Sequence, residues 1–173
     1  MSSVTDRIEK SIVLRAPVAR VWHAIADAGE FSRWFGFVLD GPFEVGKRMR
    51  GTFTGTLDEA AIMDAQRRLG VPPSGIKPPP PDAVFCTVDA IEPERRFAFR
   101  WIPYGIDADA DPAHEPTTLV ELVLEPVAEG TRLTVTESGF DQVPAHRRAR
   151  AFRMNEGGWG AQVENLRRHV EGA

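Results

Sequence analysis

Hydrophobic and polar residues change their spacing several times along the chain. Residues 8–14 alternate at period two, which predicts a strand with its apolar side chains on one face. Residues 16–27 then follow helical spacing, and a second, shorter helical stretch follows at residues 29–35. The pattern therefore predicts one strand and two short helices in this part of the chain.

Later stretches return to the alternating pattern and predict antiparallel strands. Their Val, Ile, Leu, Phe and Thr residues suit half-buried strands, and turn residues separate them. These strands are expected at residues 46–55, 82–92, 95–103, 117–126 and 131–140. The second and third form one hairpin, and the fourth and fifth form another.

The stretch after these strands follows helical spacing. Five apolar residues at successive separations of seven, four, three and four share one stripe: Phe152, Trp159, Val163, Leu166 and Val170. A strand, two helices, antiparallel strands and a long helix, in that order, predict an α+β fold. A curved sheet around the long helix would leave room for a hydrophobic cavity between them.

Residues 1–173 are expected to form one domain with an insertion at residues 58–82 between two strands. The insertion contains a short helical stretch and then four consecutive prolines, which favour a stiff extended segment. We expect a lid over one end of the cavity, with Ile62, Met63 and Leu69 facing the opening. A disordered surface decoration is the alternative.

Three glycines interrupt the long helical stretch around Trp159. Gly157, Gly158 and Gly160 each cost about 1 kcal/mol relative to alanine in a helix interior. Close packing of the helix on the first strands, or a bend of the helix around the cavity, would explain them, with Trp159 filling the gap. A break between a short helix and a long one is the alternative explanation.

The charge and the cysteine content exclude several classes of partner and site. The net charge of −4 and the isoelectric point near 5.6 argue against binding to nucleic acid or to an anionic membrane. Cys86 is the only cysteine, which excludes an intrachain disulfide and fits a cytoplasmic protein. No apolar stretch is long enough for membrane insertion as a helix. The basic cluster at residues 146–150 is interpreted as a solvated helix face.

An acidic stretch between the two hairpins resembles the start of a calcium-binding loop. Asp107, Asp109 and Asp111 have the spacing of an EF-hand, but Pro112 stands where glycine is needed and Thr118 where glutamate is needed. We therefore interpret this stretch as a solvated loop. No histidine or cysteine pattern indicates a metal or nucleophile site, so neither a metal nor a cofactor is expected.

Glu137 continues an otherwise apolar strand face. It follows Leu133 and Val135 in the alternation, so it points into the interior if the strand stays regular. Burial would then raise its pKa. Fraying of the strand at Gly139, which would place the carboxylate in water, is the alternative.

Four stretches of the sequence resemble the START-like helix-grip superfamily, also called SRPBCC. They are IEKSIVLRAPVARVWHAIADAGEFSRWF, ERRFAFRW, GTRLTVTESGF and GGWGAQVENLRRHV. They look most like the branch named after the activator of the heat-shock-protein-90 ATPase. The resemblance implies a curved antiparallel sheet wrapped around a long C-terminal helix, two short helices after the first strand, and a hydrophobic cavity. Relatives bind lipids or small hydrophobic compounds, carry aromatic polyketides, or cyclise them.

The aromatic interior without a catalytic motif favours a binding protein for a hydrophobic small molecule or lipid. The residues expected to line the cavity are Trp34, Phe53, Phe99, Trp101, Glu137 and Trp159. One alternative is a cyclase, dehydratase or hydrolase in which Glu137 acts as acid or base and Arg50 or Arg100 steadies an oxyanion. Another is a protein-interaction domain, either a homodimer or a co-chaperone-like module.

Overall fold

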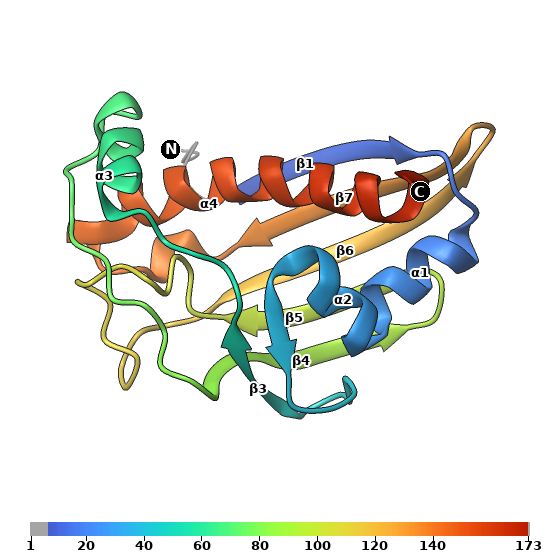
Figure 1. The fold of residues 1–173 in the computed structure, drawn as a ribbon, viewed down its shortest axis with the longest axis horizontal. Helices are drawn as coiled ribbons and strands as arrows, with labels where there is room; N and C mark the ends of the chain where they lie inside the picture. The colour runs from blue at the N-terminus through green and yellow to red at the C-terminus, as the bar shows by residue number, and fades with distance from the viewer. Residues whose placement is uncertain (1–6, 173) are drawn as a thin grey trace.

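The computed structural model describes residues 7–172, which form one antiparallel sheet with helices (Figure 1). The strands are β1 (Arg7–Leu14), β2 (Phe37–Leu39), β3 (Arg48–Phe53), β4 (Ala83–Glu92), β5 (Arg96–Trp101), β6 (Thr118–Val127) and β7 (Gly130–Ser138). The helices are α1 (Val18–Ala26), α2 (Ala28–Phe35), α3 (Glu59–Arg68) and α4 (Ala145–Arg167), with short 3-10 and π turns at Phe140–Gln142 and Arg168–Gly172. The predicted α+β fold is confirmed.

The strands pair in the order β1-β7-β6-β5-β4-β3-β2, so the first strand lies beside the last. The helix α4 runs along β1 and packs on α2, while α1 contacts β6 and β7 (Figure 1). Inward-facing residues recur at every second position of the strands and are buried, among them Leu14, Val120, Leu122, Leu133 and Val135. This repeat is the physical reason why alternation predicted the longer strands.

The sequence pattern did not predict β2. This strand pairs with β3 at the edge of the sheet, where Val38 lies opposite Thr52. A strand of three residues is too short to show a clear alternation. Gly36, with φ of 97°, ends α2 immediately before β2 and lets the chain reverse direction.

The helix α4 runs without a break through its three glycines, so the alternative explanation, a break between two helices, is wrong. Gly157, Gly158 and Gly160 also have open space where a Cβ atom would lie, with no heavy atom within 4 Å apart from the adjoining residues and the backbone of the helix itself. Close packing is therefore wrong as an explanation too, because an alanine side chain would fit at each position. The glycines weaken the helix, and no neighbouring atom requires them.

Replacing Gly158 by alanine should raise the free energy of unfolding by about 0.5–1 kcal/mol, because alanine has the higher helix propensity and would meet no neighbour. Urea denaturation of the two proteins measures the difference. Gly130 is the contrasting position, since a Cβ there would lie 2.2 Å from the Leu14 carbonyl oxygen. Destabilisation by Gly158→Ala would contradict the open geometry around the helix.

Residues 58–82, which the sequence predicts to be an insertion, fold as α3 and an extended segment that returns to β4. Figure 1 shows α3 beside the start of α4, at one end of the sheet. Ile62, Met63 and Leu69 were predicted to face the opening of the cavity. The prediction is wrong for Leu69, which is 45 % exposed, while Ile62 and Met63 are half-buried. The residue of α3 that is fully buried is Gln66.

Polar contacts explain why Gln66 rather than an apolar residue faces inward. Its Nε2 donates to Tyr104 Oη at 2.8 Å, and the Ser74 amide donates to its Oε1 at 2.8 Å. The Ser74 hydroxyl in turn donates to Asp107 Oδ1 at 3.1 Å. A buried amide with these partners holds α3 to the loop after β5.

Arg147, Arg150, Asp107 and Glu115 form a buried ion cluster where α4 meets the loop after β5. Arg150 Nε donates to Asp107 Oδ2 at 2.8 Å, and Arg147 Nε donates to Glu115 Oε1 at 2.6 Å. Arg147 Nη1 lies 3.5 Å from Asp107 Oδ2, within ion-pair distance but without a hydrogen bond. The solvated helix face expected at residues 146–150 is therefore wrong for both arginines. The interpretation of the acidic stretch as a solvated loop is also wrong for Asp107, whose side chain is fully buried.

Of the three carboxylates that suggested a calcium loop, Asp107 belongs to the ion cluster, Asp109 pairs with Arg150 at 2.7 Å, and Asp111 pairs with His114 at the surface. Within residues 7–172, no group of three or more His, Cys, Asp or Glu side chains is placed to hold a metal ion. In the same range, no helix has both the length and the apolar character needed to cross a membrane.

Candidate functional site

Glu137 lies in the interior between the sheet and α4. On β7 it pairs with Ile8 of β1 and Val120 of β6, and both neighbours are buried. Its own side chain is fully buried. The strand stays paired to Ser138, so the inward direction that a regular strand predicts is confirmed and the fraying alternative is wrong.

Four side chains donate hydrogen bonds to the Glu137 carboxylate. Trp101 Nε1 lies 2.8 Å from Oε2, and Trp159 Nε1 lies 2.9 Å from Oε1. Thr118 Oγ1 lies 2.6 Å from Oε2, and Asn155 Nδ2 lies 3.0 Å from Oε2 and 3.1 Å from Oε1. Two donors come from the sheet, on β5 and β6, and two come from α4.

The charge of this carboxylate has only neutral partners. Burial raises the pKa of Glu137, and the hydrogen bonds from Thr118, Trp101, Trp159 and Asn155 act against this rise. In the part of the chain that the structure describes, no Lys, Arg or His forms an ion pair with it. The site is therefore an acid held by dipoles alone in an apolar interior.

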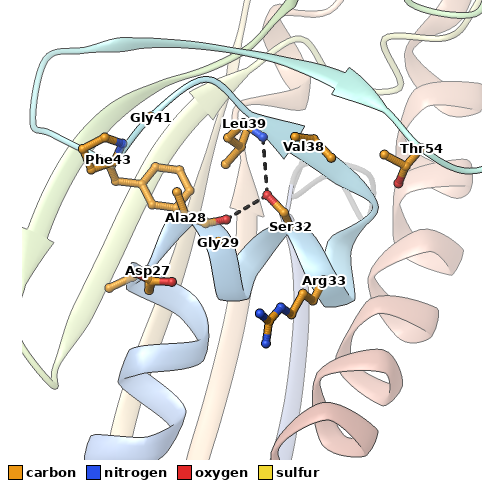
Figure 2. A pocket seen from close by; sticks show the side chains of 12 residues that line it. Asp27, Ala28, Gly29, Ser32, Arg33, Val38, Leu39, Gly41, Phe43 and Thr54 are labelled. Carbon is orange, nitrogen blue, oxygen red and sulfur yellow. Dashed lines mark hydrogen bonds between the residues drawn. The ribbon is translucent and has the colours of Figure 1, made fainter.

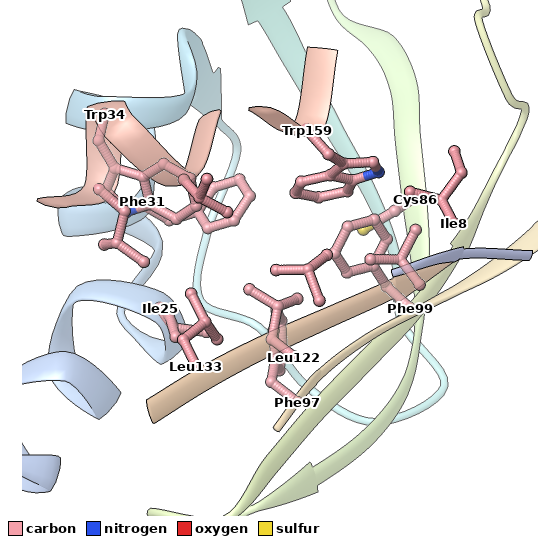
Figure 3. Packing of buried hydrophobic residues seen from close by; sticks show 14 of the residues in the cluster. Ile8, Ile25, Phe31, Trp34, Cys86, Phe97, Phe99, Leu122, Leu133 and Trp159 are labelled. Atoms are coloured by element: carbon pink, nitrogen blue, oxygen red, sulfur yellow. The ribbon is translucent and has the colours of Figure 1, made fainter. Parts of the chain in front are cut away.

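Aromatic rings surround the carboxylate and its donors. The Trp101 ring centroid lies 5.7 Å from that of Trp159 and 5.3 Å from that of Phe99. Phe35 lies 5.9 Å from Trp101 and 6.0 Å from Trp159. Figure 3 shows Trp159 of α4 above Phe99 of β5. These rings pack edge to face or tilted, and they occupy the space between the sheet and α4.

Of the six residues predicted to line a cavity, four gather at this site and two lie further out. The Trp34 indole donates to the Ala24 carbonyl at 2.9 Å rather than to Glu137. Phe53 is half-buried and contacts Phe37 near the edge of the sheet, with ring centroids 5.6 Å apart. The site is thus smaller than the predicted lining set.

Sequence reasoning missed Thr118 and Asn155, although the sequence contains a signal for each. Thr118 shares the inward period-two face of β6 and pairs across the sheet with Trp101. Asn155 lies three positions after Phe152 and four before Trp159, on the apolar stripe of α4. Each is a polar residue on a buried face, the same kind of signal that identified Glu137.

Among the described residues, none of the other chemical candidates forms a hydrogen bond or an ion pair with Glu137. Arg100 pairs with Asp89 at 3.7 Å, and Arg50 is exposed, so neither faces Glu137. Burial raises the pKa of the Cys86 thiol to about 12, which leaves it protonated and unreactive near neutral pH.

Two hollows on the described surface lie away from Glu137. One, of about 760 Å³, lies between α2 and the segment that joins β2 to β3 (Figure 2). In its wall, the Ser32 hydroxyl donates to the Ala28 carbonyl and accepts from the Leu39 amide. The other, of about 640 Å³, lies between residues 15–19 and the turn from β6 to β7. Neither hollow is lined by Glu137 or by any of its four donors.

The Glu137 carboxylate can accept hydrogen bonds from a bound molecule in place of those from its protein donors. The Glu137 oxygens offer acceptor positions, and the indoles of Trp101 and Trp159 offer ring faces beside them. A role in acid–base chemistry would also need a group that stabilises the charge of the reacting molecule. Among the described residues no cation faces Glu137 to do so.

Comparison with known proteins places the chain in a family. Residues 5–171 match the family described as polyketide cyclase/dehydrase and lipid transport. The comparison with curated proteins found no match. Protein MLL2253 from Mesorhizobium loti has a similar structure, with 23 % identity over 95 % of this chain and 96 % of that chain, at a TM-score of 0.64.

Two further solved structures have the same fold. The Aha1 dimer from Colwellia psychrerythraea is 15 % identical over 95 % of this chain and 96 % of that chain, at a TM-score of 0.62. DynU16, a protein of the dynemicin biosynthetic locus, is 24 % identical over 96 % of this chain but 47 % of that chain, at a TM-score of 0.61. The resemblance to the START-like helix-grip superfamily is confirmed, and the chain belongs to the polyketide cyclase/dehydrase and lipid transport family.

Proposed function

We propose that this protein binds a hydrophobic small molecule between the sheet and α4, with Glu137 as the polar contact. The observation that carries the proposal is a fully buried carboxylate whose four partners are all neutral donors. A buried charge without a countercharge costs several kcal/mol, and packing alone gives no reason to keep it. Binding of a ligand would explain why the buried acid and the surrounding ring faces are present.

Entry of a ligand requires the aromatic interior to open, and we propose that α4 is the element that moves. Asn155 and Trp159 bind Glu137 from α4, whereas the other two donors belong to the sheet. Gly157 and Gly158 lie between Asn155 and Trp159 and weaken the helix there. Outward movement of this segment would uncover Glu137 and leave its two sheet donors in place.

The insertion at residues 58–82 is the proposed cover for one end of this interior. Arg150 Nη1 donates to the Pro72 carbonyl at 3.2 Å, and Gln66 donates to Tyr104. These contacts support a cover held beside the start of α4 while the middle of α4 opens.

The family and the ring faces support a flat polycyclic or lipid-like ligand. The family description names polyketide and lipid chemistry, and DynU16 comes from a biosynthetic locus. Flat molecules stack well on rings such as those of Phe99, Trp101 and Trp159. Binding is preferred to catalysis because Arg50 and Arg100 lie away from Glu137. The dimer from Colwellia psychrerythraea supports self-association as a separate proposal.

Titration with flat polyketides, flavonoids and fatty acids tests the proposal. A ligand at one hundred times its Kd should stabilise the protein by about 2.7 kcal/mol and therefore raise its Tm. Trp101→Phe reduces the ring face on which a flat ligand would stack and removes the N–H that holds the Glu137 carboxylate in place, so it should weaken binding. Trp22→Phe is the matched control, since Trp22 is half-buried on α1 and makes no hydrogen bond to Glu137. An unchanged Tm and unchanged tryptophan emission across the panel would contradict the proposal.

A further inference from the structure

The buried acids of this chain differ in how their charges are compensated. Asp107 has Arg150 at 2.8 Å, and Glu115 has Arg147 at 2.6 Å. Glu137 is as deeply buried as Asp107, yet it has hydrogen-bond donors only and no cation among the described residues. Glu137 is therefore the buried carboxylate whose countercharge is left for another molecule to supply.

The rings around Glu137 favour a cation at the same place. The indoles of Trp101 and Trp159 lie 5.7 Å apart, and Phe35 lies within 6.0 Å of both. The electron-rich faces of such rings attract ammonium groups, most strongly where water is excluded. An anionic ligand would meet both the carboxylate and these ring faces unfavourably.

Asn155 is the donor that a ligand can most readily replace. Its contacts with Glu137, at 3.0 and 3.1 Å, are the longest of the set, and its side chain is only half-buried. It lies on α4 directly before the weak helical segment at Gly157 and Gly158. Its amide faces both carboxylate oxygens, which is also the position that a protonated amine would take.

We propose that the ligand carries a protonated amine that replaces the Asn155 amide at Glu137, on a flat hydrophobic body that packs against Trp101 and Trp159. This inference rests on the proposed function and narrows its ligand class to amphiphilic amines. The amine donates hydrogen bonds to the two carboxylate oxygens and pairs with their charge. Fatty acids and other carboxylates are the disfavoured members of the same hydrophobic class.

Three matched naphthalenes test the inference by calorimetric titration at pH 7.5. They carry a CH2NH3⁺, a CH2OH or a CO2⁻ group on the same ring. The amine should bind at least about tenfold more tightly than the alcohol, because it gains an ion pair and contacts with the ring faces. The carboxylate should bind more weakly than the alcohol.

Two variants and one control test whether the Glu137 carboxylate causes the preference for the amine over the alcohol. Glu137→Gln should abolish the advantage of the amine over the alcohol, because the variant has no negative charge with which the ammonium group can pair. Asn155→Ala keeps the acid and removes the competing donor, so it should tighten amine binding. Asp111→Asn, in the exposed part of the acidic loop, should leave the preference unchanged and thereby exclude a general effect of surface charge.

The outcomes separate the ligand class from the binding function. Equal binding of the three compounds, or tighter binding of the carboxylate, overturns the amine inference and leaves the proposed function standing. An amine preference that persists in Glu137→Gln, or that weakens in Asn155→Ala, also overturns it. Failure of all three naphthalenes and of the wider panel to bind overturns both.

Discussion

Replacing Asp107 by asparagine is expected to lower the free energy of unfolding by about 3–5 kcal/mol, the usual cost of removing one partner of a buried ion pair. The carboxylate accepts from Arg150 Nε at 2.8 Å and lies 3.5 Å from Arg147 Nη1. Both guanidinium groups are buried, so a neutral amide leaves their positive charges poorly compensated. Urea denaturation at neutral pH measures the change.

The effect of pH on this variant has a defined sign. Burial acts to raise the pKa of Asp107, but the Arg150 guanidinium and the Asp109 amide hold it below its usual value of 3.8. The stabilisation is therefore fully present above pH 3.8 and is lost as the pH falls through the lower folded-state pKa. The difference in free energy of unfolding between wild type and Asp107→Asn should therefore become smaller as the pH falls below 3.8.

Asp64→Asn is the matched control for this measurement. The Asp64 side chain is 60 % exposed and forms a surface pair with Arg68 at 3.3 Å. Loss of such a pair should change the free energy of unfolding by less than about 0.5 kcal/mol. Similar losses in Asp64→Asn and Asp107→Asn would show that the ion cluster has no special importance for stability.

Replacing Glu137 by glutamine is expected to destabilise the protein by about 1–3 kcal/mol, the cost of one buried donor left without an acceptor. An indole N–H can only donate. One carboxylate oxygen accepts from Trp101 and the other from Trp159. Whichever way the amide turns, its NH2 group faces one of these two indoles. Urea denaturation at pH 8 measures the effect.

Glu125→Gln provides the comparison on the outer face of the same sheet. Glu125 is 61 % exposed and pairs with Arg132 at 2.8 Å, so its replacement should change stability by less than about 0.5 kcal/mol. The indole N–H signals in an NMR spectrum give a second measurement, because Glu137→Gln should shift those of Trp101 and Trp159. Unchanged stability together with unchanged indole signals would mean that the carboxylate is not needed for this hydrogen-bond set.

Periodicity in the sequence was sufficient to predict which residues of a single strand or helix face the interior. The alternation through Leu133 and Val135 placed Glu137 in the interior, and the stripe through Trp159 placed α4 on the core. The same logic would have found Thr118 and Asn155, because both are polar residues on faces that are otherwise buried. These features follow from which side of a strand or helix meets water.

Features that depend on pairing between distant segments could not be predicted in this way. Arg150 and Asp107 look solvated in their own segments, and only the fold brings them together across 43 positions. The packing of Gln66 against Tyr104 likewise joins the insertion to a loop 38 positions away. Periodicity also says nothing of volume, so it could not tell a cavity from an interior filled with rings.

The position of α4 after every strand has a consequence for protein synthesis. This helix supplies both arginines of the ion cluster and, in Asn155 and Trp159, half of the donors to Glu137. A nascent chain that has already released all the strands still lacks these partners for its inward-facing acids. The apolar face of the sheet therefore stays uncovered until α4 has left the ribosome, and until then it needs protection from aggregation.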